Sequence, residues 1–150
     1  MLNERKDPLF GATIYGVYGL VYFMKAIDDK PLAFWLKLAD GSGLRISCAS
    51  DGERIITDRE FPWPCDMQDD GALLLKDESC AAPWKGIVGA KVVSTYDVVD
   101  SVSRSVIGLG VSVDTGRSVY MLNLGDELWI FDSIEAPALR QNSLDIIKRW

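Results

Sequence analysis

Residues 32–57 read LAFWLKLADGSGLRISCASDGERIIT, and this stretch decides the fold class. Apolar side chains recur at every second position on either side of two turn signals, Asp40-Gly41-Ser42-Gly43 and Asp51-Gly52. A period of two indicates strands with one buried face, and glycine supplies the positive φ that tight hairpin turns need. The stretch therefore predicts a meander of three antiparallel strands.

The same period recurs along most of the chain. It predicts a long strand over residues 12–27, bent or bulged at Gly16 or Gly19, and further strands between residue 86 and residue 131. Residues 58–83 carry three prolines and one short apolar run, so we expect a long loop there with at most one small strand. Pro137 suits a first helical turn and Ser143 can cap a second piece, which predicts a short helix within residues 137–150.

The size and composition favour one domain. The chain has 150 residues, of which 48% are hydrophobic and 25% charged, close to the averages for soluble globular proteins. No change in composition marks a linker, so we expect a single β-rich domain over residues 1–150. Eight or nine strands with one short C-terminal helix predict a mainly β fold, an antiparallel sandwich or a barrel-like sheet.

The chain contains no histidine, and this excludes several kinds of chemistry. Histidine is the usual general base at neutral pH and the commonest metal ligand, and the Ser-His-Asp and Cys-His mechanisms need it. Gly108-Leu109-Gly110 lies inside a strand pattern and lacks the helix of a dinucleotide site. We therefore predict a protein that is not an enzyme, with no catalytic residue, cofactor or metal.

Three cysteines, Cys48, Cys65 and Cys80, are too few for a disulfide framework or a zinc site. We expect free thiols of a reducing cytoplasm, with Cys48 in the core because it lies on an alternating strand pattern. Residues 9–24 are uncharged but shorter than a bilayer span. The acidic Glu4 and Asp7 lie before them, in the region that would be basic in a signal peptide. We interpret it as part of a strand, and the protein as cytoplasmic with no membrane partner.

The net charge of −6 is concentrated in one segment. Residues 51–78 contain nine acidic and three basic residues, so this segment carries the whole excess. An acidic surface repels phosphate backbones, which excludes nucleic acid as a partner and favours a basic protein. The acidic candidates for the partner-binding site are Asp51, Glu53, Asp58, Glu60, Asp66, Asp69, Asp70, Asp77 and Glu78.

Phe61-Pro62-Trp63-Pro64-Cys65 lies in the middle of the same segment. Alternate prolines favour a stiff, extended backbone, and stiffness lowers the ordering cost of binding. A tryptophan that loses water on binding is a common hot spot of interfaces. Phe61 and Trp63 therefore complete the predicted site as its aromatic anchor. In the competing interpretation both rings pack back over the sheet and the carboxylates are merely solvated.

The chain resembles the small acidic, β-rich immunity proteins of bacterial polymorphic-toxin and contact-dependent growth inhibition systems. The resemblance rests on size, charge and residues 116–132, which read GRSVYMLNLGDELWIFD. It implies a cytoplasmic, non-enzymatic inhibitor that binds a cognate toxin domain. Such toxins are often nucleases with basic substrate clefts, where an acidic face competes with nucleic acid.

Two other functions remain open at this stage, as does the oligomeric state. One is a barrel that binds a small molecule in an apolar cavity, lined by Tyr15, Tyr18, Tyr22, Trp35 and Trp129. The other is a carboxylate-dependent hydrolase, which requires two acidic side chains in one cleft. The adjacent pairs Asp69-Asp70, Asp77-Glu78 and Asp126-Glu127 do not provide this on a strand, because neighbouring residues there point to opposite faces.

Overall fold

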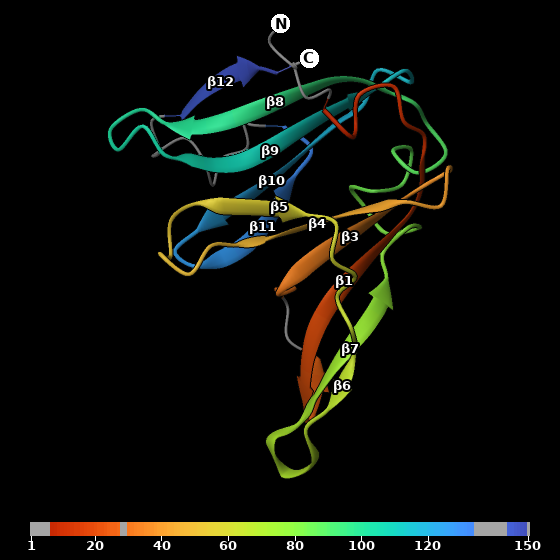
Figure 1. The fold of residues 1–150 in the computed structure, drawn as a ribbon, viewed down its shortest axis with the longest axis vertical. Helices are drawn as coiled ribbons and strands as arrows, with labels where there is room; N and C mark the ends of the chain where they lie inside the picture. The colour runs from red at the N-terminus through yellow and green to blue at the C-terminus, as the bar shows by residue number, and fades with distance from the viewer. Residues whose placement is uncertain (1–6, 28–29, 134–143, 150) are drawn as a thin grey trace, which may run out of the picture.

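The computed structural model describes residues 7–27, 30–133 and 144–149, and these form two antiparallel sheets (Figure 1). The first sheet has the order β5-β4-β3-β1-β7-β6, with β2 paired to β1. Its strands are β1 (Ile14–Met24), β2 (Ala26–Ile27), β3 (Ala33–Leu38), β4 (Gly43–Cys48), β5 (Ile55–Asp58), β6 (Cys65–Asp66) and β7 (Ala72–Asp77). The second sheet has the order β11-β10-β9-β8-β12. Its strands are β8 (Val92–Asp100), β9 (Val106–Val113), β10 (Ser118–Leu124), β11 (Glu127–Phe131) and β12 (Leu144–Lys148).

The three-stranded meander predicted for residues 32–57 is confirmed. β3 pairs with β4 and β4 with β5, and the two predicted turns connect them. The pairing of β1 with β3 shifts register between Ile14 and Gly16, so the predicted bulge lies beside Gly16. Beyond Met24 the chain turns back and β2 pairs with the end of β1, so the long strand ends earlier than predicted.

The two sheets pack face to face around one hydrophobic core, which makes the fold a sandwich of two open sheets rather than a closed barrel. Phe34, Leu36 and Ile46 of the first sheet join Val111 and Met121 of the second in a single buried cluster. Trp84, in the turns between β7 and β8, is 1% exposed and packs edge-to-face on Phe34 with ring centroids 5.4 Å apart. Burial of this cluster supplies the main driving force for folding.

Two predictions of secondary structure were wrong. Residues 58–83 are not one long loop, because β7 pairs with β1 along six residue pairs and β6 and the 3₁₀ turn η1 (Gln68–Asp70) precede it. The described end of the expected C-terminal helix is instead β12, in which Ile146 lies opposite Val98 of β8. Residues 137–143 of that expected helix lie outside the described residues. With twelve strands in the described residues, the count also exceeds the predicted eight or nine.

An ion-pair network attaches the first described residues and β12 to β8. The Asp7 side chain is 1% exposed, and its carboxylate accepts hydrogen bonds from the Leu9 amide at 3.0 Å and the Thr95 hydroxyl at 2.8 Å. Arg149 lies 3.4 Å from Asp7 and 3.4 Å from Asp97. Burial raises the pKa of Asp97; the charge of Arg149 lowers it and that of Asp7 raises it further. Arg149 therefore compensates two carboxylates that would otherwise repel each other.

Replacing Arg149 by methionine is expected to destabilise the fold by about 2 kcal/mol at pH 7, because the buried Asp7 carboxylate loses its counter-charge. Without Arg149 the pKa of Asp97 rises further above its unfolded value. The ionised form of Asp97 then penalises the fold, and the loss of stability should be smaller near pH 4.5 than at pH 7. Urea unfolding at the two pH values measures both effects.

Arg104→Met is the matched control. The Arg104–Asp145 pair also links β12 to another part of the second sheet, the β8–β9 turn, but both of its side chains are at least half exposed. Its cost should stay within about 0.5 kcal/mol, as for most surface ion pairs. Equal effects of the two substitutions would contradict the role assigned to Arg149.

Candidate functional site

The chain between β5 and β6, residues 59–64, forms a strap across the outer face of the first sheet (Figure 1). β5 and β6 lie at opposite edges of that sheet, so the connection has to cross it. Proline has no N–H for a ladder hydrogen bond, which suits Pro62 and Pro64 to a segment that crosses strands. Pro62 is buried while Phe61 and Trp63 on either side of it are exposed. The strap thus presents both aromatic rings on the outer face.

A row of side chains lies beneath the strap. The register places Asp77, Tyr18, Trp35, Arg45 and Asp58 opposite one another on five successive strands, from β7 through β1, β3 and β4 to β5. Residues directly opposite in antiparallel strands project to the same face. The row runs along the face opposite the core, since the neighbours of Trp35 in sequence are core residues. Two carboxylates therefore flank a tyrosine, a tryptophan and an arginine.

Three aromatic rings form a ladder from the sheet to solvent. Trp35 is 9% exposed and lies over Gly43, where a Cβ atom would collide with the indole ring. Phe61 packs edge-to-face on Trp35 at 5.3 Å, and Trp63 packs edge-to-face on Phe61 at 4.8 Å. Trp63 ends the ladder and is 75% exposed. Such contacts hold a large exposed ring in one orientation.

An open hollow of about 480 Å³, which we call the aromatic hollow, lies beside this ladder. Tyr18, Trp35, Phe61 and Leu75 supply apolar walls, while Lys37 and Asp77 supply one charge of each sign. The Asp77 carboxylate accepts a hydrogen bond from the Ser79 amide at 2.9 Å. The hollow thus combines apolar surface with charged groups at its border, as binding sites commonly do.

Arg45 fastens the beginning of the strap. One of its terminal nitrogens lies 2.6 Å from Asp58 and 3.2 Å from Glu60. Burial raises the pKa of Asp58, but its hydrogen bonds with Arg45 and with the Glu60 amide outweigh this, so the pKa lies below its ordinary value. The hydrogen bond to Asp58 raises the pKa of Arg45. Both groups are therefore charged at neutral pH.

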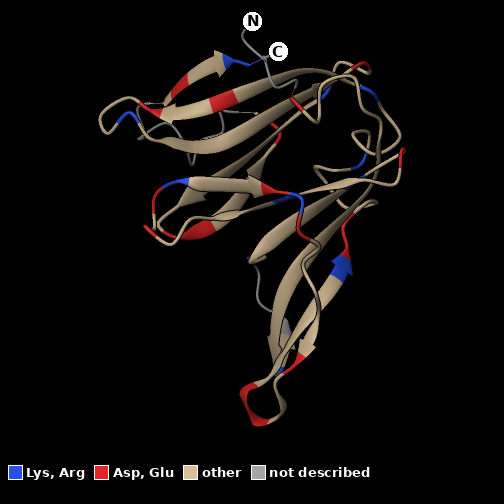
Figure 2. Cartoon of the chain, in the orientation of Figure 1, with Lys and Arg blue, Asp and Glu red and all other residues tan. Residues whose placement is uncertain are grey.

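The nine acidic candidates do not form one patch (Figure 2). The structure separates them into four places along the first sheet. Asp51 and Glu53 lie in the turn before β5, and Asp58 and Glu60 at the start of the strap. Asp66, Asp69 and Asp70 lie in and beyond β6, and Asp77 and Glu78 at the end of β7. Asp58 and Asp77 belong to the row beneath the strap, and Glu60 contacts its Arg45.

Several of these carboxylates also hold turns. Asp51 accepts hydrogen bonds from the amides of Glu53 and Arg54, and these bonds with the Arg54 side chain lower its pKa to about 2. Asp66 accepts from the Gln68 amide in the same way. Glu53, Asp69 and Asp70 are exposed and make no ion pair within the described residues. The acidic candidates thus divide into turn residues and solvated charges.

The residues proposed to line a ligand cavity are not brought together. Tyr18 and Trp35 meet at the aromatic hollow, but Tyr22 donates a hydrogen bond to the Asp70 carbonyl and Tyr15 is 66% exposed. Trp129 belongs to the second sheet, where it stacks on Phe131 beneath Lys30. The sheets do not close into a barrel, and their facing sides are filled by the shared core. The barrel that this alternative required is therefore not formed.

The carboxylates that meet at the start of the strap are held by an arginine. Asp58 and Glu60 converge on Arg45, which keeps the Asp58 pKa low, whereas a general acid needs a raised pKa. In residues 7–27, 30–133 and 144–149, no three acidic or cysteine side chains are grouped to hold a metal. Burial and the charge of Asp126 raise the pKa of Cys48 to about 11, so this partly buried thiol stays protonated at neutral pH.

From the sequence, Phe61 and Trp63 were named as candidates but Arg45 was not. The alternative of a ligand-binding barrel placed Trp35 and Tyr18 in the lining of an apolar ligand cavity. The alternation in β3 indicates that Trp35 faces away from the core, because the residues on either side of it are core residues. The pairing of Trp35 with Arg45 is set by the β3–β4 hairpin, whereas the full row also needs the pairing of β1 with β7, which lie far apart in sequence.

The sequence matches no protein-family model, and the comparisons with curated proteins and with solved structures also give no match. Among the helical segments of the described residues, none has the length and apolar character needed to cross a membrane. Residues 116–132, which carry the resemblance to immunity proteins, form the β10–β11 hairpin of the second sheet, with Val119, Met121 and Leu128 in the core.

Replacing Gly43 by alanine is expected to cost about 1–3 kcal/mol of stability, because the new methyl group displaces the Trp35 ring. The loss should appear in urea unfolding, and the indole N–H signal of Trp35 should shift in a ¹H–¹⁵N spectrum. In a Trp35→Leu background the same alanine should cost less than about 0.5 kcal/mol, since the ring it meets is gone. An equal cost in both backgrounds would place the effect elsewhere.

Proposed function

We propose that this protein is a non-enzymatic inhibitor that binds a basic toxin domain in the cytoplasm and covers its active or substrate-binding site. The observation that carries this is Trp63, a ring 75% exposed yet held by contacts with Phe61, which in turn packs on Trp35. A large ring held in place before binding loses little entropy when it is buried, which is the property of an interface hot spot.

The electrostatics support a basic partner. The residues around the strap and in the loops on either side of it carry the chain's net charge of −6. Exposed carboxylates need not touch the partner to act, because their summed charge accelerates association with a partner of opposite charge. The resemblance of residues 116–132 to immunity proteins suggests the kind of partner, a toxin domain.

Trp63→Ala is expected to weaken binding of the partner by about thirtyfold, which corresponds to about 2 kcal/mol for a lost hot spot. The assay co-expresses each variant with a toxin-like domain encoded beside the gene for this chain, records growth, and then titrates the purified pair. Val102→Ala is the matched control, because Val102 is 87% exposed in the β8–β9 turn of the other sheet. Full protection by Trp63→Ala would contradict the proposed surface.

The association rate constant with that toxin-like domain should fall by about tenfold or more between 50 mM and 500 mM NaCl, because salt screens the exposed carboxylates. Stopped-flow mixing measures this rate. The dissociation rate should change much less, since it depends mainly on the buried aromatic contact. An association rate independent of salt would refute the electrostatic part of the proposal.

A further inference from the structure

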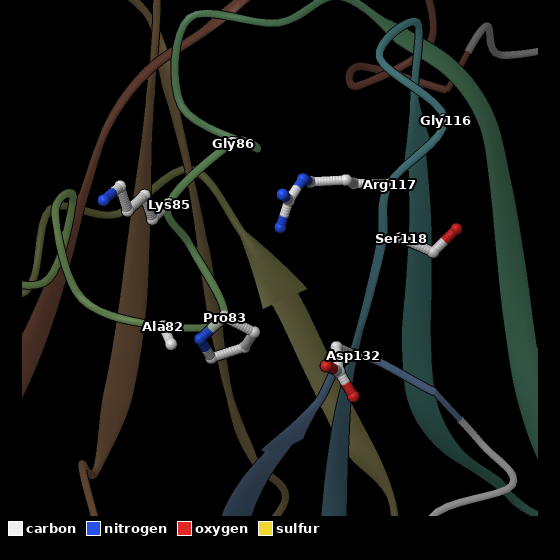
Figure 3. A pocket seen from close by; sticks show the side chains of 8 residues that line it. All are labelled: Ala82, Pro83, Lys85, Gly86, Gly116, Arg117, Ser118 and Asp132. Carbon is white, nitrogen blue, oxygen red and sulfur yellow. The ribbon is translucent and has the colours of Figure 1, made fainter.

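A second hollow, of about 680 Å³, lies between the turns at residues 81–86 and the hairpin turn that joins β9 to β10 (Figure 3). It is remote from the strap along the chain and shares no lining residue with the aromatic hollow. Lys85, Gly86, Gly116, Arg117, Ser118 and Asp132 contribute to its walls. We call it the Arg117 hollow, because the Arg117 guanidinium points across it from the β10 side toward Gly86.

Within the described residues, Arg117 has no carboxylate partner, although the chain has six more acidic than basic residues. Four other described arginines, Arg45, Arg54, Arg104 and Arg149, lie within 3.4 Å of an acidic oxygen. Of the described arginines, Arg59 and Arg117 form no such pair. Both residues are exposed, but Arg117 also lines a hollow. A guanidinium there keeps all its donors available to a ligand.

The backbone around Arg117 is arranged to receive its side chain. Gly86 has φ near +90°, and a Cβ atom there would lie 2.7 Å from Cδ of Arg117. The arginine stem therefore runs close against the Gly86 backbone, and any residue other than glycine at position 86 would collide with it. The Thr115 hydroxyl donates a hydrogen bond of 3.2 Å to the Gly86 carbonyl and ties the two turns together. The guanidinium is thus presented between two connected segments of backbone.

We propose that the Arg117 hollow binds a small oxyanion, a carboxylate or a phosphate group. A guanidinium offers parallel N–H donors that match two oxygens of either group. Figure 3 shows the Lys85 ammonium group and the Ser118 hydroxyl pointing away from the Arg117 guanidinium. The Ser118 hydroxyl lies 2.7 Å from that of Ser112, so Arg117 is the group expected to bind the anion. Asp132 lines the same hollow and repels anions, so we expect affinities in the millimolar range for inorganic phosphate or acetate. This proposal is independent of the function proposed for the strap.

The test is a titration of the full chain with inorganic phosphate and, separately, with acetate, followed by ¹H–¹⁵N spectra at constant ionic strength maintained with chloride. We expect saturable shifts at the Gly86 and Gly116 amides with at least one anion. The anion that binds more tightly distinguishes a phosphate group from a carboxylate as the natural occupant.

Arg117→Gln should weaken this binding by about tenfold or more, because it removes the charge and the paired donors. Arg59→Gln is the matched control, since it removes the other unpaired arginine and should leave the dissociation constant unchanged. Asp132→Asn should tighten binding several-fold by removing a repulsive charge. Spectra that do not change with either anion, or equal affinities of the wild-type chain and Arg117→Gln, would overturn the proposal. Unchanged signals from the core residues show that each variant is folded.

Discussion

The chain has to pass from β5 to β6, which lie at opposite edges of the first sheet, and this crossing determines the character of the outer face. A connection without ladder partners needs other contacts to hold it. Arg45 binds Asp58 and Glu60 at its beginning, Phe61 packs on Trp35 in its middle, and Cys65 pairs with Leu73 at its end. The aromatic surface therefore follows from the strand order, which requires the strap. Phe61, which holds the strap by packing on Trp35, is also partly exposed on it.

The clustering of acidic residues in one segment has a partly structural origin. A segment that turns repeatedly needs side chains that accept hydrogen bonds from backbone amides, and aspartate does this well. Asp51, Asp58, Asp66 and Asp77 each accept such a bond from the amide two residues ahead. Of the other five, Glu60 pairs with Arg45 and Glu78 with Lys76, while Glu53, Asp69 and Asp70 make no ion pair within the described residues. The acidic residues of this segment therefore have different roles, since some accept hydrogen bonds in turns and others are exposed to solvent. The structure distinguishes them, whereas the sequence does not.

The sequence was informative where structure is local. The meander at residues 32–57 was predictable because its strands are adjacent and its turns carry aspartate and glycine. β7 was missed because Leu73-Leu74-Leu75 does not alternate, and its partner β1 lies about fifty residues earlier. β12 was predicted as helix from capping signals, yet its pairing with β8 decides its conformation. In the same way, the prolines around Trp63 marked it as a candidate anchor, whereas Arg45 was not recognised because its ion pairs with Asp58 and Glu60 are made between strands.

In the proposed function, the charged groups and the aromatic rings near Arg45 would contribute to binding in different ways. Arg45 already compensates Asp58 and Glu60, so a basic partner gains little from these two carboxylates unless it displaces Arg45. Among the described residues, Glu53, Asp69 and Asp70 form no ion pair, and they lie in the turns before β5 and before β7. Charges at the periphery act mainly on the rate of encounter, while a buried ring acts on the lifetime of the complex. Under the function proposed above, the surface would capture a basic protein from a distance and hold it by Trp63.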